Sequence, residues 1–219
     1  MFYRLIFIAL LSLTVVTASQ AGWRYGGARD GQGQNQHSNQ NRSQALSVGE
    51  AEQLRYLREE EKLARDVYQA LYQRWNLIVF DNIAQAEQRH MDAVLGTLNQ
   101  YALVDPGLSQ AGLFSNQELQ SLYDRLVDEG AESPMAALRV GALIEEVDMQ
   151  DLDTMIATTE KEDLIGLYDT LHCGSRNHLR AFVRQIESRG QVYTAQVMSQ
   201  ESVDLIVDSP MERRCGWNR

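Results

Sequence analysis

The sequence predicts an all-α protein in which four long helices pack into a bundle. Apolar residues recur at spacings of three and four through several long stretches, which is the pattern of one helix face. The chain has 219 residues but only three prolines, so few helices are interrupted. It is also rich in Leu, Ala and Glu, which favour helices.

The N-terminal segment 1–21 is expected to be a signal peptide. Arg4 precedes an apolar run over 5–16, and Ser19 and Ala21 put small residues where signal peptidase cleaves. An uncleaved N-terminal anchor is the alternative, although the run is short for a membrane span. A signal peptide predicts a periplasmic or secreted protein. Segment 22–44, rich in Gly, Gln and Asn, lacks the apolar residues of a core and is expected to be a disordered spacer.

The acidic charge and the cysteine count exclude several classes of partner and of metal site. A formal charge of −10 without a basic patch argues against nucleic acid and anionic membranes as partners, and it is compatible with cation handling. We therefore expect no membrane association once the signal is cleaved. Cys173 and Cys215 can form a disulfide in an oxidising compartment. Two cysteines do not support a structural zinc site or a rubredoxin-type iron centre.

Capping signals divide segment 45–210 into its helices. Ser47 and Glu50 form a capping box that opens the first long helix, which runs to about residue 75, and the second covers about 79–101. A long connection over 106–132 carries a short helix that opens with a capping box at Ser115–Glu118 and stops near Gly130.

The third long helix begins at Ser133–Pro134, and the fourth covers about 162–189 and closes at Gly190. Two helix pairs joined by one long crossover let the second and third helices run parallel, an arrangement known among four-helix bundles. The tail adds a short helix around 203–207, and 211–219 is expected to be a C-terminal tail.

Each long helix carries polar residues on its apolar stripe near mid-length. Charged groups on a core-facing stripe are costly unless they are paired or bind a metal. Carboxylate and imidazole ligands suit iron, manganese or zinc. Taken singly, a glutamate in an acidic run such as Glu61 is more often part of a solvated face, and a histidine such as His178 is more often a core residue bonded to a carbonyl. The predicted metal ligands are Glu61, Glu87, His90, Glu145, Asp148 and His178.

These residues lie in motifs that resemble rubrerythrins and the wider ferritin-like di-iron superfamily. The pair Glu87-x-x-His90 matches the superfamily's ligand pair, and Glu145-x-x-Asp148 resembles its Glu-x-x-Glu. The segment 60–68 resembles the rubrerythrin segment with Glu, Ala-Arg and Tyr at these offsets. More closely, segments 60–68, 82–90, 144–148 and 174–182 resemble an uncharacterised domain-of-unknown-function family of ferritin-like proteins.

The resemblance implies a ferritin-like four-helix bundle with a dinuclear iron site, Tyr68 orienting a ligand or supplying an electron, and an external electron donor. It also makes a homodimer an expectation. The chain departs from the pattern at Ser175, where the superfamily has a Glu three residues before His178. Either Asp148 replaces that carboxylate, or one metal binds weakly, or the site is mononuclear.

Three function classes follow. The leading one is an exported metal-binding protein that oxidises Fe(II) with O2 or peroxide. The second is a non-catalytic protein in which the metal stabilises the fold, and Ser175 favours it. The third, a partner-binding module, has no specific support in the sequence.

Overall fold

The computed structural model describes residues 45–213 and 215, and the described part of the chain is all-α, as predicted, with six helices and no strand. The predictions of a signal peptide and a spacer concern residues 1–44, which lie outside the described residues. No helix in the described part is both long enough and apolar enough to cross a membrane. The helices are α2 (Val48–Trp75), α3 (Ile78–Gln100), α4 (Gln117–Gly130), α5 (Pro134–Thr158), α6 (Glu162–Glu187) and α7 (Gln200–Val207).

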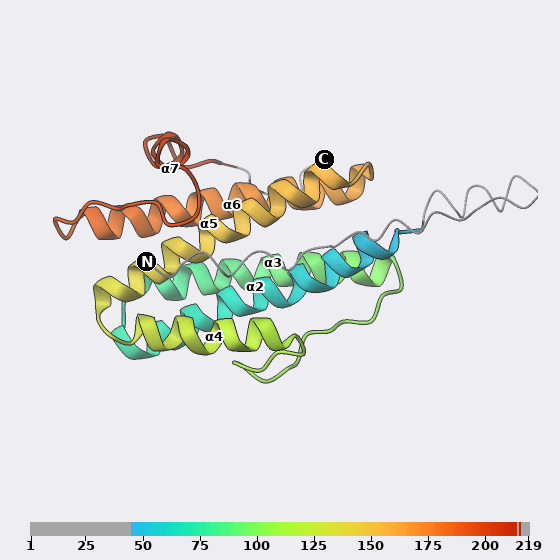
Figure 1. Cartoon of the computed structure of the whole chain (residues 1–219), viewed down its shortest axis with the longest axis horizontal. Helices are drawn as coiled ribbons and strands as arrows, with labels where there is room; N and C mark the ends of the chain where they lie inside the picture. Colours follow the sequence, from blue (N-terminus) through green and yellow to red (C-terminus); the bar gives the residue numbers. More distant parts are fainter. Residues whose placement is uncertain (1–44, 214, 216–219) are drawn as a thin grey trace, which may run out of the picture. The chain divides into compact units, whose positions relative to one another are not determined.

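The four long helices pack as two pairs. Helix α2 lies against α3 and α5 against α6, and the pairs meet through α2 with α5 and α3 with α6 (Figure 1). The two short links, 76–77 and 159–161, make the members of each pair antiparallel. The chain then crosses the length of the molecule, so that α3 and α5 run in the same direction (Figure 1). Helix α4 covers α2 and α5, and α7 packs on α6.

The helix ends follow the capping rules with one correction. Ser47 and Glu50 form the predicted capping box, and Ser133 caps α5 with Pro134 behind it. Helix α4, however, is capped by Asn116 rather than Ser115. The Asn116 side chain accepts from the backbone N–H groups of Glu118 and Leu119. The Ser115 hydroxyl instead donates to the carbonyl of Pro106, so the predicted box does not form.

A fully buried lysine holds the long crossover on α2. The ammonium of Lys62 lies 2.5 Å from Asp66 and donates to the carbonyls of Gln110 and Leu113 at 3.0 and 3.1 Å. It also lies 4.4 Å from the centroid of the Phe114 ring. These bonds satisfy backbone carbonyls of a segment without regular structure, which would otherwise be costly to bury.

The apolar core consists of two clusters, one toward each end of the long helices. On α2, Leu54 and Leu57 belong to one cluster, and Leu63 and Val67 belong to the other. The polar residues of the four stripes occupy the level between these clusters. A polar layer enclosed on both sides by apolar packing is shielded from water, which strengthens every electrostatic interaction within it.

Candidate metal centre

Five of the six predicted ligands form two groups that share one carboxylate. Glu61, Glu87 and His90 form the first group, and the candidate ligand atoms within it lie within 4.8 Å of one another. Glu87, Glu145 and His178 form the second group by the same measure. The ligands come from all four long helices, and all are buried except the partly exposed His90.

Glu87 faces both histidines, one with each oxygen. Its Oε2 lies 2.8 Å from Nδ1 of His90, and its Oε1 lies 2.7 Å from Nδ1 of His178. Each histidine also faces a carboxylate of its own. Glu61 Oε2 is 3.3 Å from His90 Nδ1, and Glu145 Oε2 is 3.4 Å from His178 Nδ1. The two imidazoles are stacked with their centroids 5.4 Å apart.

Two ligand atoms each about 2.1 Å from one ion, at an angle of about 90–109°, lie about 3.0–3.4 Å apart. The separations of 3.3 and 3.4 Å match donors that converge on one metal ion, whereas the two from Glu87 are shorter. Hydrogen bonding satisfies these atoms only in part, since His90 Nδ1 hydrogen-bonds to Glu61 Oε2. Within the described part of the chain, His178 Nδ1 and Glu61 Oε1 are buried and make no hydrogen bond. Buried polar atoms without partners require an explanation, and a bound cation would supply one here.

The two histidines decide the ionisation of the central carboxylate. Burial by itself raises the pKa of Glu87, but His178 and His90 outweigh burial and hold it well below the usual range. Burial lowers the histidine pKa values, yet Glu87 and Glu145 raise the pKa of His178 to about 10, and Glu61 and Glu87 raise that of His90 strongly. Without a metal, protons therefore occupy the nitrogens that would bind one.

The outer carboxylates respond differently. Burial raises the pKa of Glu61 to about 7 although His90 opposes the shift. Burial also raises the pKa of Glu145. The hydroxyl of Tyr68 donates to Glu145 Oε1 at 2.5 Å and fixes the orientation of this carboxylate. A bound cation would favour the charged form of both acids.

Asp148 lies near the two groups but is a member of neither. The Ser175 hydroxyl, at the position where the superfamily pattern has Glu, donates to Asp148 Oδ2. Asp148 Oδ1 is buried and has no hydrogen-bond partner among the described residues. Burial, followed by the charges of Glu61 and Glu145, raises the pKa of Asp148 well above its usual range.

The adjacent glutamates of α2 and α5 have separate roles. Glu146 accepts from the hydroxyl of Tyr193 at 2.5 Å and from three consecutive backbone N–H groups, 196–198, so it anchors the segment after α6. Glu60 lies beside Asp151 of α5. The acidic run 59–61 is buried, not solvated. Its three members face different neighbours.

Sequence reasoning gave no role to Gly174. A Cβ atom at this position would lie 2.5 Å from Nε2 of His90, so only a glycine leaves room for the imidazole in its present place. A glycine inside a helix costs about 0.5–1 kcal/mol relative to alanine. A glycine in the interior of a helix, one turn before His178, was therefore the feature of the sequence that could have revealed this role.

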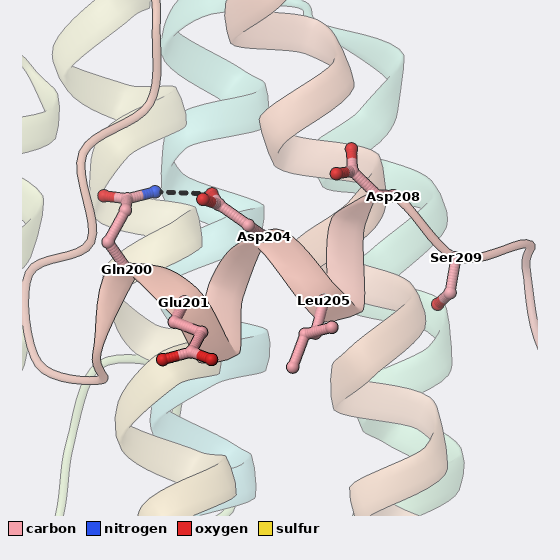
Figure 2. A pocket seen from close by; sticks show the side chains of 6 residues that line it. All are labelled: Gln200, Glu201, Asp204, Leu205, Asp208 and Ser209. Atoms are coloured by element: carbon pink, nitrogen blue, oxygen red, sulfur yellow. Dashed lines mark hydrogen bonds between the residues drawn. The ribbon is translucent and has the colours of Figure 1, made fainter.

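Two other features lie outside this centre. Cys173, Cys215 and Glu212 come together, but the cysteines form a disulfide and Glu212 pairs with Arg176 and Arg180, so the group is not a metal site in this state. A shallow groove along α7, lined by Gln200, Glu201, Asp204, Leu205, Asp208 and Ser209, contains none of the predicted ligands (Figure 2).

The chain is similar to other proteins both in sequence and in structure. It is 48% identical over 177 residues to the uncharacterized protein MJ0754 of Methanocaldococcus jannaschii, covering 80% of this chain and 95% of that protein. The crystal structure of hypothetical protein MJ0754 from Methanococcus jannaschii matches with a TM-score of 0.75 at 47% identity, over 77% of this chain and 97% of that one. The family model described as "Uncharacterized protein domain (DUF2202)" matches residues 50–210. The chain therefore belongs to the DUF2202 family.

Proposed function

We propose that this protein is a ferritin-like metal-binding protein that holds two metal ions, with iron as the leading candidate, between its four long helices. Glu61, Glu87 and His90 would hold one ion, and Glu87, Glu145 and His178 the other. The observation that carries the proposal is the position of Glu87, whose two oxygens each face a different histidine nitrogen at 2.8 and 2.7 Å. A carboxylate shared in this way is suited to bridging two cations.

The donor set restricts the metal. Carboxylates and imidazoles without thiolates suit iron, manganese or zinc. When bound, iron supplies redox chemistry, so that oxidation of Fe(II) with O2 or peroxide becomes accessible. The protein's own residues orient the ligands and exclude water. Tyr68 holds Glu145, and the two apolar clusters close the polar layer from both ends.

The cellular setting forms part of the same proposal. Segment 1–21 has the features of a signal peptide, which would place the protein in the periplasm or outside the cell. The chain contains no rubredoxin-like cysteine set, so electrons would come from an external donor. A homodimer follows only from the superfamily resemblance.

The first experiment measures the metal content of the purified chain by elemental mass spectrometry after anaerobic incubation with Fe(II), Mn(II) or Zn(II). We expect two ions per chain. The double variant Glu87→Ala/His90→Ala should lose tight binding, whereas the control Arg89→Ala, an exposed residue on the same helix, should retain it. Unchanged stoichiometry in the double variant would contradict the site.

The second candidate is a non-catalytic protein, in which the bound metal serves only to stabilise the fold. Ser175 supports it, because a hydroxyl replaces an anionic ligand of the superfamily pattern and binds Asp148 instead. Turnover separates the two candidates. A catalyst oxidises many Fe(II) equivalents per chain, whereas a structural site stops after it has bound one or two.

A further inference from the structure

A second set of carboxylates lies beside the metal centre, where α2 faces α5. Glu60 on α2 is 7% exposed and lies beside Asp151 on α5, which is partly exposed. Asp148 lies one turn before Asp151 and is also 7% exposed. Glu60 directly precedes Glu61, a proposed metal ligand. The set of acids therefore extends from the partly exposed Asp151 to the residue next to that ligand.

Three oxygens of this set are not satisfied. Glu60 Oε2, Asp148 Oδ1 and Asp151 Oδ2 are buried and make no hydrogen bond with any described residue. A buried carboxylate oxygen without a donor costs free energy, so three such oxygens on neighbouring acids point to a missing positive group.

Basic side chains of α2 do not supply that positive group. The guanidinium of Arg58 pairs with Asp105 at 3.1 Å, and Lys62 pairs with Asp66 at 2.5 Å on the crossover side of the helix. The surroundings add more negative charge. Asp148 and Asp151 both lie close enough to Glu60 to repel a charge on its carboxylate. A cation between these acids would remove the repulsion.

We propose that Glu60 and Asp151 form a weak divalent-cation site that receives hydrated ions from solvent and passes them, past Asp148, to the metal centre. The role as an access site depends on the proposed function of that centre. With two carboxylates and no imidazole, the site suits a hard ion that keeps several waters. Such an ion is held loosely enough to move on. Charge of one sign around a binding site also raises the local concentration of counter-ions and their association rate, by about 10- to 1,000-fold in strongly charged clefts.

Mn(II) is the probe, because free and bound Mn(II) differ in their electron paramagnetic resonance spectra. The full chain is titrated for stoichiometry and mixed rapidly with Mn(II) for the rate of filling. Asp151→Asn and Glu60→Gln remove one carboxylate each with little change in volume. Asp153→Asn is the matched control, since its carboxylate lies on the same helix and is 66% exposed. Circular dichroism verifies that each variant is folded.

We expect two tight Mn(II) in all four proteins and a third, weak Mn(II) only in the original chain and in Asp153→Asn. Filling of the tight sites should be about tenfold slower in Asp151→Asn and Glu60→Gln. The Glu87→Ala/His90→Ala variant should keep the weak site alone. Equal filling rates and no third ion would overturn this inference and leave the proposed function intact. Absence of tight Mn(II) from the original chain would instead overturn the proposed function, and the access role with it.

Discussion

Gly174 leaves the space in which the imidazole of His90 lies, so the centre depends on a missing side chain as well as on its ligands. Any Cβ here would meet Nε2 of His90 at 2.5 Å and Cε1 at 2.6 Å. The imidazole cannot withdraw without leaving Glu61 and Glu87, which both face its other nitrogen. Gly174 thus fixes a ligand position by packing.

Replacement of Gly174 by alanine should weaken metal binding at least tenfold, because His90 must move. Gly166→Ala is the matched control. It lies on the same helix with no atom within 4 Å of the added Cβ, and it should stabilise the protein by up to about 1 kcal/mol through helix propensity. Metal affinity by competition titration and unfolding free energy by urea denaturation provide the two measurements. Equal affinities in the two variants would contradict the packing role.

The sequence singled out the proposed ligand residues only with help from the resemblance. Periodicity leaves a register uncertainty of one residue at Glu60–Glu61 and at Glu145–Glu146, and both members of each pair are buried. Burial therefore cannot tell which member of each pair is the proposed ligand. Glu60 is buried against Asp151, and Glu146 is buried against backbone N–H groups. Only the packing of neighbouring segments tells which glutamate faces the histidines.

At the level of elements, the part of the crossover that precedes α4 has no helix or strand and is held by side chains. Lys62 lies at the centre of this interaction and connects α2 to residues 110–114. Asp66 also accepts from Arg65 and from the backbone N–H of Gly112. These bonds place the start of α4, and through it the start of α5, relative to α2.

Lys62→Met should lower the unfolding free energy by about 3 kcal/mol, because it removes one partner of a buried ion pair and leaves two carbonyls without a donor. The aliphatic stem keeps most of its packing. Arg89→Met, on the exposed face of α3, should change stability by no more than about 0.5 kcal/mol. Urea denaturation of the metal-free proteins measures both. A loss below about 1 kcal/mol in Lys62→Met would show that the crossover does not depend on this contact.

The helix boundaries were largely predictable, whereas one cap was not. The predicted limits differ from the observed ones by one residue at each end of α3, by two at the end of α6 and by three at the start of α7. Ser115 and Asn116 are both good caps by local chemistry. The choice falls on Asn116 because the Ser115 hydroxyl donates to the carbonyl of Pro106, while the backbone N–H groups of both residues donate to Glu59 of α2.

In the whole molecule, the polar layer links stability to pH. The pKa of His178 is raised from 6.5 to about 10, so its contribution is complete below pH 6.5 and is lost as the pH rises toward 10. Glu61, raised to about 7, loses its contribution in the same direction above pH 4.5. Glu87, whose pKa is depressed, contributes above pH 4.5 and loses this contribution as the solution becomes more acidic.

We therefore expect the metal-free protein to be most stable near pH 4.5 and to lose stability as the pH rises toward 10. Metal ions must displace the protons of the two histidines. The affinity of the protein for metal ions should therefore increase as the pH rises toward 10. Excess Mn(II), at 100 times its dissociation constant, should add about 2.7 kcal/mol for each of the two proposed sites. Urea denaturation with and without Mn(II) at pH 5.5, 7.0 and 8.5 measures both trends. Stability of the metal-free protein that rises from pH 6.5 to 8.5 would contradict them.

The sequence alone determined the all-α class, the helices and the presence of polar groups on four apolar stripes, because helix formation and amphipathicity are local properties that repeat every few residues. The tertiary structure decided which of these groups meet. It divided the core into two clusters, turned Glu61 rather than Glu60 toward His90, joined Cys173 to Cys215 and set Asp148 against Ser175. These outcomes depend on contacts between residues far apart in the chain, which no local pattern records.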